Sequence, residues 1–259
     1  MYTLGLDIGS TSSKGVILKD GTEIVAKVVV PLGTGTSGPA KVEQALFEQL
    51  EIQRETIANT IVTGYGRMTY KGAQKQISEL SCHTRGLLFI ESGIRTIIDI
   101  GGQDAKAMSI DANGHLSDFV MNDKCAAGTG RFLDVIARVL DVSVDELGAL
   151  SEKSSKEVSI SSTCTVFAES EVISHLSSAV PIEDIIAGVH KSIAKRVSSL
   201  AKRVGVKSKV AMVGGVAQNK GVVKAMREIL EVEIIVPEMA QLTGALGAAV
   251  YAFDEIKDR

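Results

Sequence analysis

Two stretches of the sequence share one order of elements. Residues 4–30, "LGLDIGSTSSKGVILKDGTEIVAKVVV", and residues 95–121, "RTIIDIGGQDAKAMSIDANGHLSDFVM", each predict a buried strand, a polar turn, a second strand, a hairpin turn and a third strand. A constant offset of 92 relates four pairs of identical residues: Asp7 and Asp99, Ile8 and Ile100, Gly9 and Gly101, and Lys14 and Lys106. This repeat predicts two similar α/β halves that face each other across a cleft.

Helices and further strands are expected after each copy. The first copy is followed by a helix from Pro39 to Leu50, a strand and turn in "TIVTGYGRM", and a helix in "KQISELSCHTRGLLFI". The second is followed by two helices that each begin at a cysteine, a long helix from Ile182 to about Val204, and a strand, Gly-Gly turn and helix in "SKVAMVGGVAQNKGVVKAMREIL". The strand "VEIIVP" and the helix "QLTGALGAAVYAFDEIK" end the chain. We expect residues 1–94 and 243–259 to form the first half and residues 95–242 the second.

The polar turns of the two copies are candidate phosphate sites. Backbone N–H groups and hydroxyls of a Gly-, Ser- and Thr-rich turn bind anions, and Lys14 adds an ammonium group. The candidate residues are Gly9, Ser10, Thr11, Ser12, Ser13 and Lys14 in the first turn, and Gly101, Gly102, Gln103 and Asp104 in the second. A plain hairpin loop explains either turn alone equally well, but two equivalent turns favour one polyphosphate bound from both sides.

Other residues complete this expected site. Asp7 and Asp99, at strand ends, suit Mg²⁺ held through water, and Gln103 and Asp104 are catalytic candidates because of their place in the second turn. The segment "MVGGVAQN" is expected to place two glycines at a strand end and to open a helix there. This suits a nucleotide, since glycine allows close approach and a helix N-terminus favours phosphate. We expect Gly214, Gly215, Val216 and Asn219 to contact it, and Gln241 to border the adenine.

Together these motifs resemble the superfamily of acetate and sugar kinases, heat-shock 70 proteins and actin. In that resemblance, "LGLDIGSTSSKGVIL" and "IDIGGQDAKAM" are the two phosphate motifs and "VGGVAQN" is the adenosine motif. "MNDKCAAGTGRF" and "TGALGAA" resemble two connecting helices that pack through small residues, including Gly244, Gly247 and Ala248. The resemblance implies two ribonuclease H-like α/β halves around a nucleotide cleft.

Composition indicates which partners and which cellular compartment to expect. A net charge of −3 gives no reason to expect nucleic acid or an anionic membrane. No apolar run approaches the roughly 18 residues of a membrane span, and the N-terminus has no basic region typical of a signal peptide. Three cysteines cannot form a disulfide framework, so we expect a reducing, cytoplasmic compartment.

Two cysteines are each expected at the head of a helix: Cys125 in "MNDKCAAGTGRFLDVIARVL" and Cys164 in "SSTCTVFAESEVISHL". A helix N-terminus stabilises a thiolate. One chain offers two such thiols, whereas a [4Fe–4S] cluster usually needs four. A two-fold dimer would double the set and supply four.

The cysteines can also be ordinary buried residues, and for Cys82 this is the favoured interpretation. Zinc bound with His83, His115, His175 or His190 remains another alternative, although no Cys/His pair has finger-like spacing.

The two cysteine segments are also similar to those of the activators (component A, "archerase") of 2-hydroxyacyl-CoA dehydratases, relatives of the benzoyl-CoA reductase ATPase subunits. This resemblance, which runs from end to end, implies one [4Fe–4S] cluster per homodimer, bound by Cys125 and Cys164 of each chain. It implies an electron from ferredoxin or flavodoxin, ATP hydrolysis with Mg²⁺, and delivery of the electron to a dehydratase (component D). The alternatives are a small-molecule kinase of the same fold and a zinc-stabilised regulatory ATPase.

Overall fold

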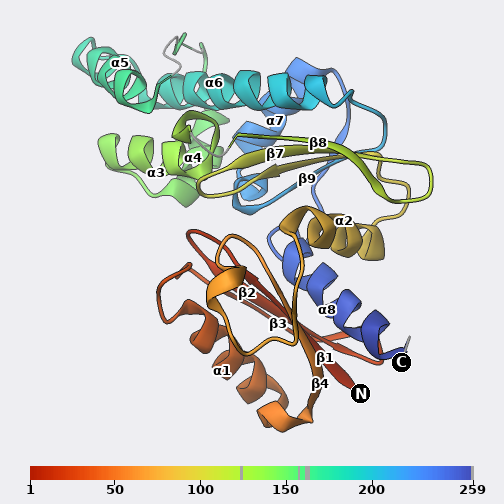
Figure 1. Cartoon of the computed structure of the whole chain (residues 1–259). Coiled ribbons are helices and arrows are strands. Elements are labelled where there is room, and N and C mark those ends of the chain that lie inside the picture. Colours follow the sequence, from red (N-terminus) through yellow and green to blue (C-terminus); the bar gives the residue numbers. More distant parts are fainter. Residues whose placement is uncertain (123–124, 157, 161–163, 258–259) are drawn as a thin grey trace. The chain divides into compact units, whose positions relative to one another are not determined.

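The computed structural model describes residues 1–122, 125–156, 158–160 and 164–257, which divide into two compact units (Figure 1). The first unit comprises Met1–Ile94, Asp111–Leu116 and Pro237–Arg259, and the second comprises Arg95–Ile110 and Ser117–Val236. The division therefore differs from the expected one in two places. Residues 237–242 and the hairpin turn at 111–116 both group with the first unit.

The first unit is built on a five-stranded sheet in the order β3-β2-β1-β4-β5. Its strands are β1 (Tyr2–Ile8), β2 (Ser13–Lys19), β3 (Glu23–Val30), β4 (Ile57–Thr63) and β5 (Lys75–Gln76). Strands β1, β2 and β3 form antiparallel neighbours, whereas β4 runs parallel to β1 and β5 runs parallel to β4. Its helices are α1 (Gly38–Leu50), α2 (Glu79–Ile90) and α8 (Thr243–Lys257).

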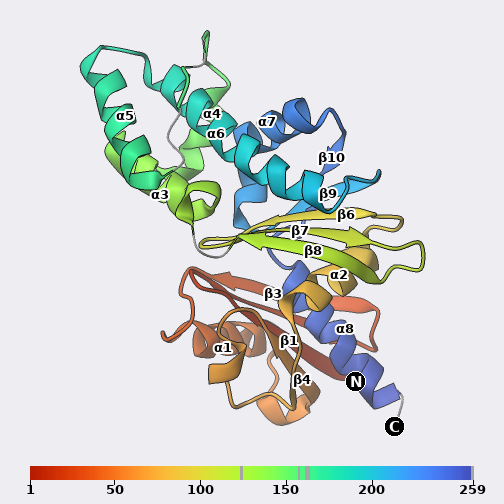
Figure 2. The ribbon, with the colours of Figure 1, turned by 45° about the horizontal axis from the view of Figure 1, so that its top comes forward.

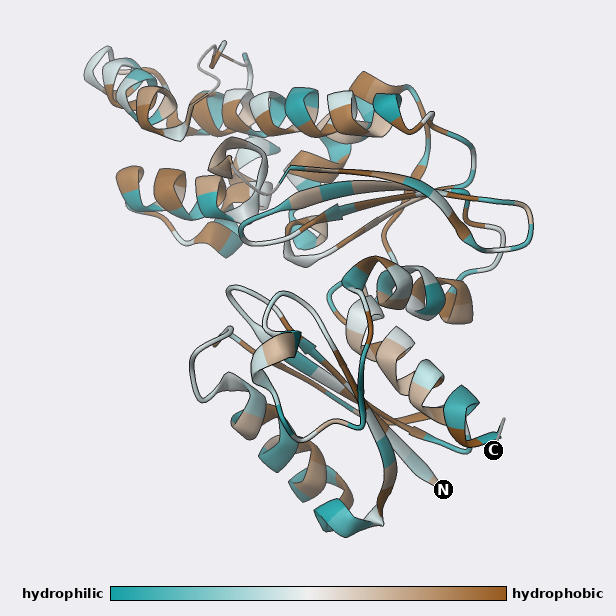
Figure 3. Cartoon of the chain, viewed as in Figure 1, coloured by the Kyte–Doolittle hydropathy of each residue, from teal (hydrophilic) through white to brown (hydrophobic). Residues whose placement is uncertain are grey.

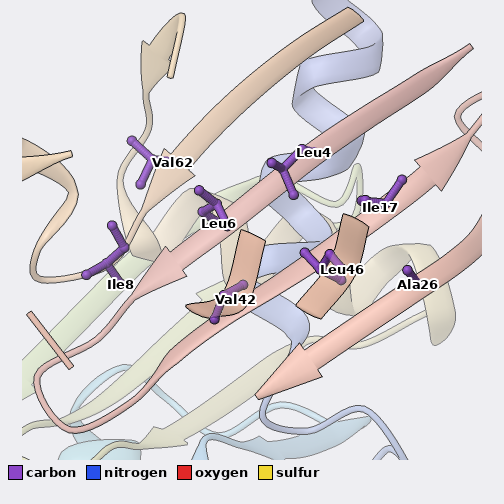
Figure 4. Close-up of a cluster of buried hydrophobic side chains, with 8 residues drawn as sticks. All are labelled: Leu4, Leu6, Ile8, Ile17, Ala26, Val42, Leu46 and Val62. Atoms are coloured by element: carbon purple, nitrogen blue, oxygen red, sulfur yellow. The ribbon is translucent and has the colours of Figure 1, made fainter. Parts of the chain in front are cut away.

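Alternation along the strands assigns one face of this sheet to α1 and the other to α8. Leu4, Leu6 and Ile8 of β1 and Ile17 of β2 are buried with Val42 and Leu46 of α1, as Figure 4 shows. The intervening residues Val16 and Leu18 of β2 are buried with Ala245 and Leu246 of α8. Because side chains alternate along a strand, the odd-numbered residues of β1 face α8. The last of these is Asp7, which therefore lies at the carboxyl end of β1, on the α8 side.

Helices α2 and α8 lie close enough for their backbones to meet at two glycines. A β-carbon on Gly247 of α8 would lie 1.9 Å from the Cys82 carbonyl oxygen and 2.8 Å from the Gly86 nitrogen of α2. A β-carbon on Gly86 would lie 2.0 Å from the Thr243 carbonyl oxygen. Within the first unit, Gly247 of the small-residue segment "TGALGAA" thus packs against α2, while the expected packing of this segment against the Cys125 segment stays a prediction.

The second unit repeats the sheet of the first in the order β10-β9-β6-β7-β8. Its strands are β6 (Thr96–Ile100), β7 (Ala105–Ile110), β8 (Leu116–Asn122), β9 (Val210–Val213) and β10 (Ile234–Ile235). Strand β6 pairs antiparallel with β7 and parallel with β9, as β1 does with β2 and β4. Strands β6, β7 and β8 thus occupy the positions of β1, β2 and β3, which confirms the predicted repeat.

Helices cover the second sheet, and most of them lie in one long connection. Residues 31–56 join β3 to β4, whereas residues 123–209 join β8 to β9. The helices of this unit are α3 (Gly130–Val139), α4 (Leu147–Ser151), α5 (Thr165–Ser177), α6 (Ile182–Arg203) and α7 (Lys220–Leu230). Helix α6 packs against α7, α4 and β7 (Figure 2). Helix α3 is amphipathic and shows both hydrophobic and hydrophilic residues in Figure 3, and its apolar residues Phe132, Leu133 and Ile136 are buried.

Helix α2 and the helix after Cys125 begin later than predicted. The helix expected over residues 75–90 begins at Glu79, because Ser78 caps it by accepting a hydrogen bond from the Ser81 N–H. Residues 75 and 76 instead form the edge strand β5. The segment after Cys125 forms a 3₁₀ turn (Ala126–Gly128), and the α-helix begins only at Gly130.

Candidate nucleotide and thiol sites

The first phosphate turn lies between β1 and β2 and is closed by a backbone hydrogen bond from Gly9 N–H to the Ser12 carbonyl oxygen, at 3.0 Å. Asp7 and Lys14 are direct partners in the β1–β2 register, and Lys14 Nζ lies 3.3 Å from Asp7 Oδ2. Asp7 is buried, while Lys14 remains partly exposed. The turn therefore combines an oriented carboxylate with an ammonium group that solvent still reaches.

The second turn, between β6 and β7, repeats this geometry with one added carboxylate. Gly101 N–H donates to the Asp104 carbonyl oxygen at 2.9 Å, and Lys106 Nζ lies 3.2 Å from Asp99 Oδ2. Lys106 Nζ also lies 2.9 Å from Asp104 Oδ2, and only 2% of the Lys106 side chain is exposed. Ser12 stands at the position of Asp104 in the first turn. The two turns thus share a scaffold but differ in charge.

A glycine with a left-handed backbone lies beside each strand-end aspartate. Gly64 (φ +89°) follows β4, and a β-carbon there would lie 2.3 Å from Asp7 Oδ1. Gly214 (φ +85°) follows β9, and a β-carbon there would lie 2.5 Å from Asp99 Oδ1. Any side chain at either position would displace the carboxylate. Gly214 was predicted to be a site residue and Gly64 was missed, although both directly follow the strand that pairs in parallel with the aspartate strand.

The expected adenosine element is a strand end, a 3₁₀ turn (Gly215–Gln218) and α7. Helix α7 therefore begins at Lys220 rather than directly after the two glycines. Asn219 caps α7 by accepting a hydrogen bond from the Val222 N–H at 3.1 Å. Gly215 and Gln218 are exposed, while Val216 and Ala217 are buried. Gln241 groups with the first unit, so its place beside an adenine stays a prediction.

Helix α3 is attached to the second phosphate turn by its first two amides. Gly130 N–H donates to the Gly101 carbonyl oxygen at 2.9 Å, and Arg131 N–H donates to the Gly102 carbonyl oxygen at 2.8 Å. These donors are among the N–H groups that a helix leaves without intrahelical acceptors. The position of α3 is therefore linked to the conformation of the turn.

The two candidate cluster cysteines differ in their relation to helices. Cys164 is exposed and directly precedes α5, where its carbonyl oxygen accepts a hydrogen bond from the Ala168 N–H at 3.0 Å. Cys125 is half-buried and precedes the short 3₁₀ turn. The prediction that both head an α-helix is therefore confirmed for Cys164 and wrong for Cys125. Helices α3 and α5, which follow the two cysteines, pack against each other.

Cys82 has a different environment from the other two thiols. It is fully buried on α2, and burial raises its pKa to about 12. No disulfide joins any of the three cysteines, all of which lie in the described ranges. Within the part of the chain that the structure describes, no group of three or more His, Cys, Asp or Glu side chains could hold a metal ion. Cys125 and Cys164 suit a shared cluster only if a second chain completes the ligand set.

Sequence comparison assigns the family. The model of the BadF/BadG/BcrA/BcrD ATPase family matches residues 4–252. The chain belongs to this family. Over 258 residues it is 64% identical to the 2-hydroxyisocaproyl-CoA dehydratase activator of Clostridioides difficile, covering 100% of this chain and 97% of that protein. It is 58% identical over 254 residues to the (R)-2-hydroxyglutaryl-CoA dehydratase activating ATPase of Acidaminococcus fermentans, covering 98% of this chain and 97% of that protein.

Similar solved structures are consistent with the family assignment and confirm the predicted fold. The structure of the 2-hydroxyisocaproyl-CoA dehydratase activator from Clostridium difficile with bound ADPNP superimposes with a TM-score of 0.98, covering 100% of this chain and 96% of that one. A sugar kinase of the ROK family, the glucokinase of Streptomyces griseus, shares the fold at 12% identity and a TM-score of 0.60, covering 98% of this chain and 100% of that one. In the described ranges no helix is long and apolar enough to cross a membrane.

Proposed function

We propose that this chain is an ATP-dependent one-electron activator of a 2-hydroxyacyl-CoA dehydratase. One observation carries the proposal. The second unit contains both a phosphate turn and the two thiols that are not fully buried, and backbone hydrogen bonds join that turn to the helix that follows Cys125. The family and the activators among its relatives support the same reading.

The chain's own groups have distinct roles toward MgATP. Amides and hydroxyls of Gly9, Ser10, Thr11, Ser12 and Ser13, with the ammonium of Lys14, bind phosphate oxygens, as do the amides of Gly101 and Gly102. Asp7 and Asp99 orient Mg²⁺ through its water ligands, which suits an ion that keeps several waters. Gln103 and Asp104 position the attacking water. Gly214, Gly215, Val216, Asn219 and Gln241 bind the nucleoside.

The cysteine pair fits a [4Fe–4S] cluster shared by two copies of the chain. Cys125 and Cys164 of each copy would hold it, and Cys164 directly precedes α5. When bound, this group would supply one-electron transfer at low potential. Cys82 is not among the proposed ligands, since it is fully buried on α2 and burial raises its pKa to about 12.

The implied partners follow from this chemistry. We infer a homodimer, a reduced ferredoxin or flavodoxin as electron donor, and a dehydratase (component D) as acceptor. The net charge of −3 gives no reason to expect nucleic acid or anionic lipid as a partner, and a chain with only three cysteines suits the cytoplasm.

Anaerobic purification followed by iron analysis and an ATPase assay tests the proposal. The expected result is a brown dimer with about four iron atoms per two chains, which hydrolyses ATP and activates an added dehydratase in the presence of a reductant. A colourless protein that transfers phosphate to an added metabolite would instead establish a kinase of the same fold. A colourless protein with stoichiometric zinc and no such transfer would establish a regulatory ATPase.

A further inference from the structure

A buried histidine contacts the segment "VGGVAQN", which is the candidate nucleoside-binding segment. His190 lies on α6 with only 1% of its surface exposed, and its Nε2 is 3.1 Å from Nδ2 of Asn219. Asn219 ends the "VGGVAQN" segment and caps α7. All of these residues belong to the second unit.

The hydrogen-bond pattern defines the tautomer of this histidine. Asn219 Oδ1 accepts from the Val222 N–H, which orients the side-chain amide and directs Nδ2 toward the imidazole. An amide nitrogen only donates, so Nε2 of His190 must accept and the ring proton must lie on Nδ1. A protonated imidazole would present an N–H to that amide nitrogen and lose the contact. Burial keeps the ring neutral by lowering its pKa to about 4.

The other ring nitrogen is costly to bury. Nδ1 of His190 is one of the buried polar atoms for which no hydrogen-bond partner exists among the described residues. A β-carbon on Gly221 would lie 2.2 Å from this nitrogen and 2.4 Å from Oγ of Ser151. Glycine at 221 therefore makes room for the imidazole. A buried donor without a partner costs about 1–3 kcal/mol, so an apolar side chain would serve a purely structural core better.

We propose that His190 is a positioning residue for nucleotide binding, which holds Asn219, and through it the turn at 214–219, in the conformation that receives the nucleoside. The inference rests on the proposed function, because it requires that this turn binds ATP. Two features of the segment agree with it. Asn219 is half-buried and contacts the histidine, and the preceding Gly215 and Gln218 are exposed, so a ligand can reach the backbone there.

Two substitutions at position 190 separate positioning from packing. His190→Gln retains an acceptor for Asn219, whereas His190→Leu has a similar volume and no acceptor. Ser198→Ala is the matched control, since Ser198 is a buried polar residue of the same helix that also contacts α7, through a 3.5 Å hydrogen bond to Met226 Sδ. Equilibrium binding of ADP and of a non-hydrolysable ATP analogue is measured with Mg²⁺, together with ATP turnover at saturation.

For His190→Leu, we expect both dissociation constants to rise by the same factor, about fivefold, which corresponds to the loss of one hydrogen bond. Turnover at saturating ATP should stay within about twofold of the wild type, because the phosphate turns are untouched. His190→Gln and Ser198→Ala should bind both nucleotides like the wild type. Unchanged binding by His190→Leu would overturn the inference, as would an equal loss in His190→Gln or in Ser198→Ala.

A spectroscopic measurement on the wild type tests the same inference without a variant. Nitrogen chemical shifts of the ¹⁵N-labelled imidazole should report a neutral ring with its proton on Nδ1, and a proton on Nε2 would overturn the proposal even if His190→Leu fails to fold. Wild-type protein that binds neither ADP nor the analogue would overturn the proposed function and this inference with it. Nucleotide binding by the wild type with the wrong tautomer would overturn the inference alone.

Discussion

The N–H of Gly130 donates a 2.9 Å hydrogen bond to the carbonyl oxygen of Gly101, so the first residue of α3 is attached to the second phosphate turn. Cys125 lies five residues before Gly130, separated from it by the 3₁₀ turn. A change in the turn on nucleotide binding can therefore shift the segment that carries a proposed cluster ligand. Such coupling is limited by the nucleotide's differential affinity for the two forms.

Substitutions at Gly130 test this coupling. In the wild type, an iron chelator should bleach the reduced dimer fastest with a non-hydrolysable ATP analogue and Mg²⁺, compared with ADP or no nucleotide. Gly130→Pro removes the donor at the first helical position, where proline is otherwise tolerated, and should make bleaching insensitive to nucleotide. Gly130→Ala retains the N–H and should keep the dependence on nucleotide. Its β-carbon, which would lie 3.3 Å from the Gly101 carbonyl oxygen, controls for the added bulk that proline also brings to this position. Nucleotide-dependent bleaching in Gly130→Pro would argue against this route.

The cysteines should separate into two classes. Cys125→Ser and Cys164→Ser should each abolish iron binding, while Cys82→Ser should retain it. In the iron-free protein, a thiol reagent near pH 8 should modify Cys125 and Cys164 and spare Cys82 until the chain unfolds, because burial raises the Cys82 pKa to about 12. Iron analysis, visible absorption and mass spectrometry provide the readouts. A brown Cys164→Ser protein beside a colourless Cys82→Ser protein would contradict the assignment.

Asp7→Asn should lower ATP turnover by about a hundredfold, since charge stabilisation carries most phosphoryl-transfer catalysis. The cluster should remain bound, because its proposed ligands lie in the second unit. Asp20→Asn provides the control. Asp20 lies in the hairpin turn after β2, and its carboxylate pairs with the N-terminal amine at 2.7 Å on the surface. Equal ATPase rates in the two variants would mean that Asp7 lies outside the catalytic site.

Gly64→Ala should destabilise the chain by about 3 kcal/mol, because a β-carbon there combines a left-handed backbone with a clash against Asp7. Gly35→Ala isolates the first of these effects. Gly35 has a φ of +76°, and a β-carbon there would meet nothing within 4 Å, so a loss of about 1 kcal/mol is expected. Urea unfolding measures both changes. Equal losses in the two variants would show that the contact with Asp7 is unimportant.

His190 should make stability depend on pH in a defined direction. Its pKa is lowered from 6.5 to about 4 in the folded chain, so the unfolded chain binds the extra proton between these values. Stability from this group is present above pH 6.5 and is lost as the pH falls toward 4, by up to about 3 kcal/mol. His190→Gln lacks a titrating group and should lose less stability between pH 7 and pH 4.5. Parallel losses in the two proteins would rule out this contribution.

Local patterns were sufficient to predict most of the scaffold and the two polar turns that follow β1 and β6. Strand alternation, turn residues and the offset of 92 gave β1, β2 and β3 and their counterparts β6, β7 and β8. Helix starts were less predictable where a short element intervened, as with the 3₁₀ turn after Cys125, because small residues fit both helix types.

Contacts between segments far apart in the sequence could not be predicted from local sequence patterns. The meeting of Gly86 with Gly247 depends on how α2 crosses α8, and the first of these glycines looked like any other helical glycine. His190 was considered only as a zinc candidate, because its partner Asn219 lies 29 residues away on a different element. Gly64 could have been found by asking which glycine follows the parallel neighbour of β1, as Gly214 follows that of β6.

The unequal connections between the third and fourth strands of the two sheets also bear on how such a chain arises. The connection from β8 to β9 is more than three times as long as that from β3 to β4, and it contains Cys125, Cys164 and helices α3 to α6. Both cysteines thus lie in one continuous stretch of the sequence, whereas the turn with its aspartate and lysine occurs once in each half. One insertion between the third and fourth strands of a repeated unit would suffice to give the second half its two cysteines.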